Sequence, residues 1–205
     1  MKKQSLSLIL CSLCAASNVF AAPTMQGTTG NIDTPSADVL RPGQYHLGWY
    51  HLNKENTVVL GANLMRRLEM SVRQQKKQDK KNVQVNLKYA LREEGVFTPG
   101  LAVGIDDIGD VTDRSVYAVT SKGLPWGFRV HAGVGSGRYD GVFAAVEKRL
   151  MPETAVGRFP DMSFCIERVD HKMNYGLRLS LSPGLKAEVG QRDGKNFVGL
   201  TYNYY

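Results

Sequence analysis

The sequence has few of the features that identify common classes of protein. Past the N-terminus it contains no run of about 18 apolar residues, which excludes a transmembrane helix. No segment has a sustained 3.6-residue period, so we expect no long helix. Cysteine is scarce, and beyond the N-terminal leader Cys165 stands alone, which excludes an intrachain disulfide. We interpret Cys165 as a small apolar residue within a strand.

Motifs for catalysis and cofactor binding are also missing. The histidines do not form the His-x-x-x-His pair of zinc proteases, and Gly133–Arg138 lacks the phosphate-loop pattern. His131 could meet a serine and an acid across strands, as in an outer-membrane hydrolase, but nothing in the sequence brings the three together. One acidic cluster departs from the spacing of a calcium loop, and we expect it to be a solvated or salt-bridged loop: Asp106, Asp107, Asp110 and Asp113. We therefore predict no enzyme activity, no cofactor and no metal.

The first residues have the pattern of a cleaved signal peptide. Lys2 and Lys3 form a basic start, Leu6–Cys14 is a short apolar stretch, and Val19–Ala21 supplies small residues at the cleavage positions. We therefore predict a signal peptide over residues 1–21 and a chain exported to the outer membrane of a diderm bacterium. The formal charge of +7, from 26 basic and 19 acidic residues, falls to 24 − 19 = +5 once the leader is removed. Residues 22–42 are polar and rich in Gly and Thr, and we interpret them as a periplasmic lead or a partial plug.

Short alternating runs separated by turn residues fill the chain after residue 42. Alternation of apolar and polar residues over such lengths predicts β-strands. The expected strands are Gln44–Leu52, Thr57–Asn63, Leu68–Gln75, Val83–Leu91, Leu101–Ile108, Ser115–Lys122, Phe128–Val134, Val142–Leu150, Phe164–Val169, Tyr175–Ser182, Leu185–Arg192 and Phe197–Tyr205. Very short turns join the last three runs, which indicates an up-and-down antiparallel meander.

Two architectures produce this alternation. A secreted β-sandwich acting as a binding module would bury the apolar set, whereas a transmembrane barrel would turn it to lipid. The aromatic-terminated last run is typical of outer-membrane barrels, and several aromatics fit interfacial girdles: Tyr45, Trp49, Tyr89, Tyr117, Trp126, Tyr175, Tyr202 and Tyr204. The sequence thus favours an all-β fold, a small antiparallel up-and-down transmembrane β-barrel of about 10–12 strands over residues 43–205, with the sandwich left as an alternative.

Charges of both signs fall on the polar face of the predicted strands. In a narrow barrel they would pair into a hydrogen-bonded plug, because buried charges need partners. This argues against a wide open pore, and a narrow porin or channel stays open as an alternative. The predicted lumen charge network is Glu69, Arg73, Lys88, Asp106, Arg129, Glu147, Arg178 and Glu188, and Arg149, Lys186 and Arg192 share the same face.

Positive charge also concentrates in one predicted hairpin. Lys76, Lys77, Lys80 and Lys81 form a basic loop, which is either simply solvated or a site for acidic glycan or lipid phosphate. We do not expect nucleic acid as a partner, because the chain is predicted to be exported and has neither a recognition helix nor an aromatic stacking platform.

Three segments carry a family resemblance. Gly27–Leu40, followed by Pro42–Tyr45, resembles the opening of YjbH-like outer-membrane proteins, which begin with a Gly-x-x-Gly-x-[Ile/Leu]-x-Thr-Pro-[Ser/Thr]-Ala segment. Pro99–Gly109 with Ser115–Lys122, and Gly133–Arg138 with Gly141–Glu147, are similar to the family in order and spacing. The resemblance extends from about residue 27 to about residue 150.

The resemblance implies an outer-membrane β-barrel associated with exopolysaccharide assembly or secretion. It brings no catalytic residues, because the family has no agreed catalytic set. Full-length relatives are several times longer than this chain, so the resemblance favours an accessory or structural role over a polysaccharide-conducting pore. The implied partners are outer-membrane lipid, acidic exopolysaccharide and other envelope proteins.

Overall fold

A computed structural model describes residues 22–77, 80–151 and 161–204, and the predicted signal peptide lies outside them. Its strands are β1 (Tyr45–Leu52), β2 (Glu55–Met65), β3 (Leu68–Lys77), β4 (Lys80–Arg92), β5 (Gly100–Asp106), β6 (Ser115–Leu124), β7 (Phe128–Gly135), β8 (Gly141–Met151), β9 (Met162–Val169), β10 (Lys172–Ser182), β11 (Leu185–Arg192) and β12 (Lys195–Tyr204). Two short 3₁₀ turns, η1 (Pro125–Gly127) and η2 (Gly137–Tyr139), flank β7. Among the described residues, no helix is long and apolar enough to cross a bilayer.

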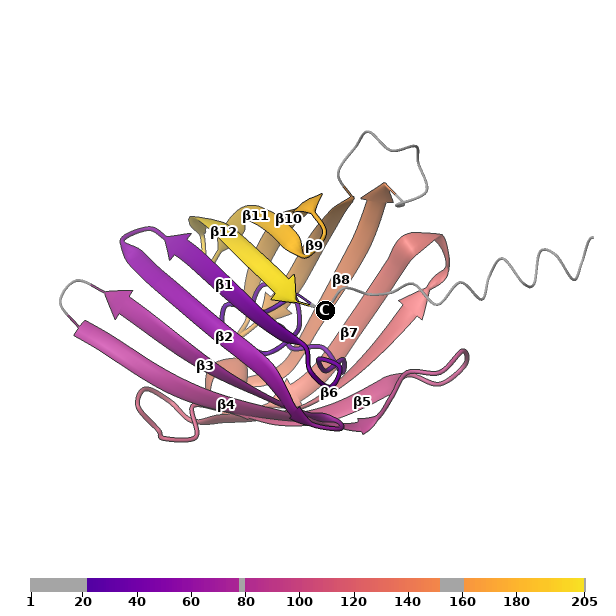
Figure 1. The fold of residues 1–205 in the computed structure, drawn as a ribbon, viewed down its shortest axis with the longest axis horizontal. Coiled ribbons are helices and arrows are strands. Elements are labelled where there is room, and N and C mark those ends of the chain that lie inside the picture. Colours follow the sequence, from indigo (N-terminus) through magenta and orange to yellow (C-terminus); the bar gives the residue numbers. More distant parts are fainter. Residues whose placement is uncertain (1–21, 78–79, 152–160, 205) are drawn as a thin grey trace, which may run out of the picture.

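The strands form one closed antiparallel barrel (Figure 1). Each strand pairs with its neighbours in sequence, and β1 pairs with β12 from Tyr45–Tyr204 to Leu52–Phe197 to close the sheet. The predicted all-β, up-and-down barrel is confirmed at twelve strands, one for each expected run. The sandwich alternative is wrong, because the sheet closes on itself and leaves no second sheet to cover its apolar face.

Alternation sorts the side chains between the two faces of the barrel wall. Leu47, Trp49 and Leu200 lie on the outer face and are 49%, 43% and 44% exposed, while His46 and Thr201 on the same strands are buried inside. Such a face is suited to lipid, since exposed apolar side chains in a continuous band are unfavourable in water. Most of the predicted girdle aromatics are exposed on this outer face, and Tyr45 stacks on Tyr204 with ring centroids 4.8 Å apart.

Tyr117 is an exception among the predicted girdle aromatics. Its side chain is buried inside the barrel, where it meets Tyr139 edge-on at 5.1 Å between ring centroids. The reason is its parity: Tyr117 shares a face of β6 with Ser115, Val119 and Ser121, all of which are buried. Gly104 on β5 makes room for the ring, because a Cβ atom there would overlap the phenol.

The interior of the barrel is filled by the chain itself. Residues 22–40, which we call the luminal segment, run inside the wall ahead of β1 and are almost entirely buried (Figure 1). Two apolar clusters join this segment to the wall. One contains Met25, Ile32, Tyr50, Leu52, Val59 and Phe197, and the other contains Ala37, Ala102, Tyr117, Val119, Tyr139, Phe143 and Val169.

Because the number of strands is even, the chain enters and leaves the barrel wall at the same end. The start of β1 and the end of β12 lie together at one end, which we call the terminal end. The turns after β1, β3, β5, β7, β9 and β11 lie at the opposite, far end. There the β5–β6 loop, residues 107–114, is the longest connection among those six.

Candidate functional site

The luminal segment folds back on itself inside the barrel. Thr24 donates its backbone N–H to the carbonyl of Thr28 over 2.7 Å, and Met25 donates to Ile32 over 2.8 Å. Gly27 has a φ of +103°, a conformation that residues with a side chain rarely adopt. Isolated bridges join Pro23 to Thr29 and Gly30 to Pro35. The segment is almost entirely buried, and several of its other backbone N–H groups donate to side chains of the barrel wall.

Glu69 on β3 holds the middle of the luminal segment. Its carboxylate accepts the N–H and hydroxyl of Thr29, at 2.6 and 2.9 Å, and the N–H of Leu40 at 3.1 Å. Lys88 on β4 lies beside it, with Nζ 3.7 Å from the Glu69 carboxylate, and donates to the carbonyl of Thr29 over 2.8 Å. The two buried charges thus compensate each other. Together they bind three backbone groups of the segment, the N–H and carbonyl of Thr29 and the N–H of Leu40.

Glu167 on β9 holds the tip of the luminal segment in the same way. Its carboxylate accepts the N–H groups of Asp33 and Thr34, at 2.8 and 2.9 Å, and the side-chain amide of Asn174 at 2.7 Å. The sequence analysis did not include Glu167 among the lumen charges. Its position was available from alternation, because Cys165, Glu167 and Val169 fall on one face of a strand and are all buried.

Arginines on the wall neutralise the carboxylates of the luminal segment. Arg129 binds Asp38 with both oxygens, at 2.7 and 2.9 Å. Asp33 bridges Arg138, at 2.8 Å, and Arg192. Burial raises the pKa of Asp33, but Arg192 and Arg138 outweigh that effect and hold it well below the ordinary value. Asp33 is therefore ionised inside the protein.

The predicted lumen charges all face the interior, and four of the eight pair with one another as expected. Arg178 and Glu188 pair with each other at 3.3 Å, as do Lys88 and Glu69 at 3.7 Å. Other charges pair with residues that the sequence analysis did not select: Arg129 with Asp38 and Glu94, and Asp106 with Arg138 at 3.3 Å and with the hydroxyl of Tyr139 at 2.7 Å. Glu147 lines a small polar cavity toward the terminal end with Arg149 and Arg178.

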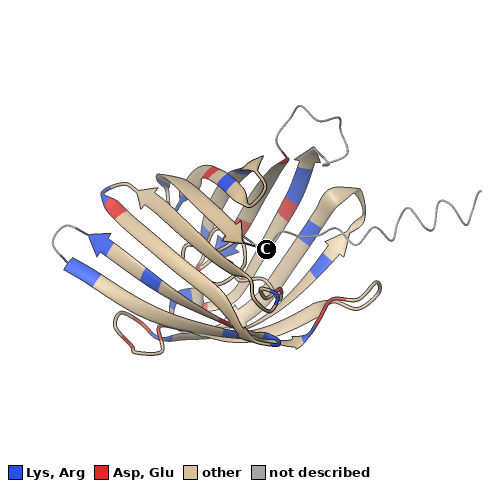
Figure 2. Cartoon of the chain, in the orientation of Figure 1, with Lys and Arg blue, Asp and Glu red and all other residues tan. Residues whose placement is uncertain are grey.

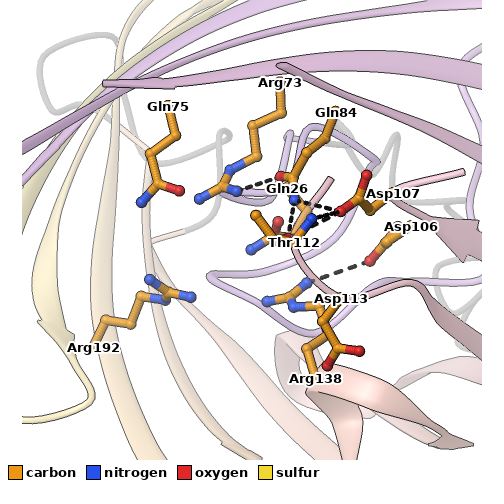
Figure 3. A pocket seen from close by; sticks show the side chains of 10 residues that line it. All are labelled: Gln26, Arg73, Gln75, Gln84, Asp106, Asp107, Thr112, Asp113, Arg138 and Arg192. Carbon is orange, nitrogen blue, oxygen red and sulfur yellow. Dashed lines mark hydrogen bonds and ion pairs between the residues drawn. The ribbon is translucent and has the colours of Figure 1, made fainter. Parts of the chain in front are cut away.

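A larger polar cavity opens at the far end, and we call it the mouth cavity (Figure 3). Its volume is about 220 Å³, well above the ~10–15 Å³ that one water molecule needs. The walls come from β3, β4, the end of β5, β11, η2, the β5–β6 loop and the luminal segment. Its lining residues are Gln26, Arg73, Gln75, Gln84, Asp106, Asp107, Thr112, Asp113, Arg138 and Arg192.

The predicted basic loop forms the rim of the far end rather than part of this cavity (Figure 2). Lys76 lies opposite Lys81, and Lys77 lies opposite Lys80, on the paired ends of β3 and β4. All four are exposed, and Lys77 binds Glu55 at 2.7 Å. The tip of this hairpin, residues 78–79, lies outside the described residues.

His131 does meet a serine inside the barrel. Its Nδ1 lies 2.7 Å from the hydroxyl of Ser121, and that hydroxyl also accepts the backbone N–H of Ala37 at 2.8 Å. Within the described part of the chain, Nε2 of His131 has no hydrogen-bond partner, and no acid completes a triad. The described residues also contain no cluster of metal-ligating side chains. We interpret the Ser121–His131 pair as an anchor for the luminal segment.

Comparison with known proteins gives one family and one fold. The family described as "Exopolysaccharide biosynthesis protein YbjH" matches residues 23–160. Among solved structures, the chain is similar to a KdgM porin, with a TM-score of 0.54 and 10% identity over 79% of this chain and 98% of the porin. A KdgM porin in complex with disordered oligogalacturonate gives a TM-score of 0.52 and 9% identity over the same shares. At these identities the likeness describes the fold alone. No curated protein matches the sequence.

Proposed function

The chain belongs to the family of exopolysaccharide biosynthesis proteins described as YbjH, and from this membership we propose that it is a non-enzymatic outer-membrane protein acting in exopolysaccharide assembly or secretion. The family match covers the luminal segment and most of the barrel, so the proposal applies to the part of the chain described above. Outer-membrane location is supported by the closed twelve-stranded barrel and its exposed apolar outer face.

The luminal segment inside the barrel supports a passive mechanism. Glu69, Glu167 and Arg129 bind the luminal segment from three sides of the wall, through backbone N–H groups and the Asp38 carboxylate. A segment held this way blocks the bore, so the barrel at rest acts as an anchored platform rather than an open pore. Its far end then offers charged loops and the mouth cavity to glycan or to partner proteins.

An acidic glycan is the partner that fits the far end best. The exposed basic loop places positive charge at the rim, and Arg73 at the mouth cavity has no ion pair with any described residue. The KdgM porin complex with oligogalacturonate offers a precedent for an acidic sugar polymer in a barrel of similar fold.

Deleting the gene for this protein in its own bacterium tests the proposed role in exopolysaccharide assembly or secretion. We expect the deletion strain to lose secreted exopolysaccharide and the full chain to restore it from a plasmid. In the restored strain, the protein should resist a urea wash of isolated outer membranes and migrate differently on a detergent gel before and after boiling. Normal exopolysaccharide in the deletion strain, or a soluble and washable protein, would overturn the proposal.

A narrow channel is the second candidate function. The observation that favours it is the mouth cavity, which already opens one end of the bore to solvent, together with the porin-like fold. Conduction would require the luminal segment to move, and an experiment on that segment is given in the Discussion.

A further inference from the structure

Arg73 differs from the other buried arginines because it has no acidic partner. Its side chain on β3 is 6% exposed. Within the described chain, its guanidinium makes one hydrogen bond, from Nη1 to the side-chain oxygen of Gln84, and Nε has no partner. No carboxylate of the described residues lies within salt-bridge distance of it. Burying a cation without a counter-charge costs free energy. A buried arginine without an acidic partner therefore indicates a position where an anion could bind.

The other two arginines at the mouth cavity have acidic partners, whereas Arg73 does not. Figure 3 shows the guanidinium groups of Arg73, Arg138 and Arg192 pointing toward one another from different parts of the wall. Arg138 and Arg192 share the single carboxylate of Asp33. Asp106 also lies at the cavity, where it binds Arg138 at 3.3 Å and the hydroxyl of Tyr139 at 2.7 Å.

The two remaining acids of the cavity do not neutralise Arg73. Oδ1 of Asp107 accepts the N–H of Val111 at 3.0 Å, and Oδ2 accepts the N–H of Thr112 at 2.7 Å and the side-chain amide of Gln84 at 3.1 Å. Asp113 is exposed, so water screens its charge. The three buried carboxylates at the cavity, Asp33, Asp106 and Asp107, therefore leave Arg73 without an ion pair.

The chemistry of the lining selects among anions. A guanidinium presents parallel N–H groups that match a carboxylate, and such bonds are stronger than neutral ones. The side-chain amides of Gln26 and Gln75 also line the cavity and can donate to or accept from hydroxyl groups.

We propose that the mouth cavity binds a carboxylate-bearing sugar unit, with its carboxylate on Arg73 and its hydroxyl groups on the neighbouring amides. The inference rests on the proposed function for the source of such a unit, an acidic exopolysaccharide. The cavity takes one sugar unit rather than a chain, so binding here captures a unit of the polymer at the far end.

Calorimetry on the full chain, folded in detergent, tests the site directly. The ligand is trigalacturonate, and the control ligand is its methyl ester, which keeps the hydroxyl groups and loses the charge. We expect binding of the acid and an affinity for the ester at least about tenfold weaker. Equal binding of the acid and the ester, or binding of neither, would overturn the proposal. Displacement of trigalacturonate by an equal concentration of inorganic phosphate would also overturn it. These measurements use the unmodified chain and need no variant.

Two matched variants then locate the site. Arg73→Gln should reduce the affinity for trigalacturonate at least about tenfold, and Arg73→Lys, which keeps the charge without the fork, should lie between it and the unmodified chain. Arg66→Gln removes the same charge from an exposed position in the β2–β3 turn at the terminal end and should bind normally. The heat-dependent gel shift shows which variants are folded. Unchanged affinity in a folded Arg73→Gln protein would contradict the assignment.

The outcomes separate this inference from the proposed function. If the deletion strain secretes exopolysaccharide normally but the purified chain binds the acid through Arg73, the site stands and the role in secretion fails. If secretion requires the chain but folded Arg73→Gln binds normally, the role stands and the site fails.

Discussion

The ammonium group of Lys88 lies 3.7 Å from the carboxylate of Glu69, and neither side chain has any exposed surface. The two residues face each other across β3 and β4, where their backbones are paired. Between them they bind Thr29 through its N–H, its carbonyl and its hydroxyl. The pair therefore links the barrel wall to the luminal segment, and each charge depends on the other.

Breaking this pair from one side should destabilise the protein strongly. Lys88→Met leaves the Glu69 charge buried without its partner, and we expect it to lower the free energy of unfolding by about 3–5 kcal/mol. Adding Glu69→Gln to Lys88→Met should cost less than the sum of the two single changes, because the unpaired charge is then gone. Urea titration of folding in detergent measures all three, with the exposed Lys81→Met as the control. Additive effects would show that the two charges are independent.

Asp33 should make the protein sensitive to acid. Because Arg192 and Arg138 lower the pKa of Asp33 in the folded protein, its ionised form stabilises the fold at pH values above the ordinary value of 3.8. That stabilisation is lost as the pH falls below about 4, toward the lower folded-state pKa. We therefore expect Asp33→Asn to be less stable than the unmodified chain near neutral pH, and the gap to narrow in acid.

Urea titrations of both proteins from neutral to acidic pH check this expectation. Other carboxyl groups titrate in the same range, so the difference between the two proteins is the quantity to follow. A gap that stays constant, or that widens as the pH falls, would contradict the assignment of Asp33 as an ionised partner of the arginines.

Gly61 is a position where even one methyl group should disturb the luminal segment. It lies opposite His46 in the β1–β2 pair, and a Cβ atom there would overlap Nε2 of His46 and lie 3.1 Å from the carbonyl of Gly27. Nε2 of His46 lies 2.6 Å from that same carbonyl. Gly61→Ala should therefore cost about 1–3 kcal/mol of stability, measured by urea titration.

A second glycine provides the control for that substitution. A Cβ atom at Gly109 would meet only Val111, at an ordinary contact distance of 3.6 Å. Gly109→Ala should leave stability nearly unchanged. If Gly61→Ala were equally neutral, the contact between His46 and the luminal segment would not be as tight as described.

Deleting the luminal segment tests whether it closes the bore. Removal of residues 24–36 takes the bound groups away from Glu69, Lys88 and Glu167, and water should enter in their place. We expect ion-conducting steps in planar lipid bilayers from the deletion variant and none from the full chain. A deletion variant that shows the heat-dependent gel shift but conducts no more than the full chain would exclude the channel candidate.

The barrel was predictable because its strands follow a simple rule. Once the barrel is chosen over the sandwich, alternation along Val83–Leu91 places Val85 outside and Asn86 inside, as the structure has them. Tyr117 was misplaced because aromatic type was weighed above parity, although its neighbours Ser115 and Ser121 already indicated an inward face. Glu167 was missed although its strand carried the same signal.

The partners of the lumen charges could not be predicted in the same way. Asp33 pairs with Arg192 across 159 positions of sequence, and Asp38 pairs with Arg129 across 91. These contacts depend on where a polar segment without strand pattern lies inside the closed wall. Alternation shows which side chains point inward, but it does not show which of them meet there.

The mouth cavity shares residues with the luminal segment. Binding of an anion in the cavity and binding of the segment to the barrel wall are therefore thermodynamically linked. Gln26 of the segment lines the cavity, and Asp33 of the segment competes with any bound anion for Arg138 and Arg192. An anion that displaces Asp33 loosens the segment, and a segment held more tightly weakens that anion by the same free energy. By this linkage, the proposed binding of a sugar unit at the mouth cavity would change the free energy that holds the luminal segment across the bore.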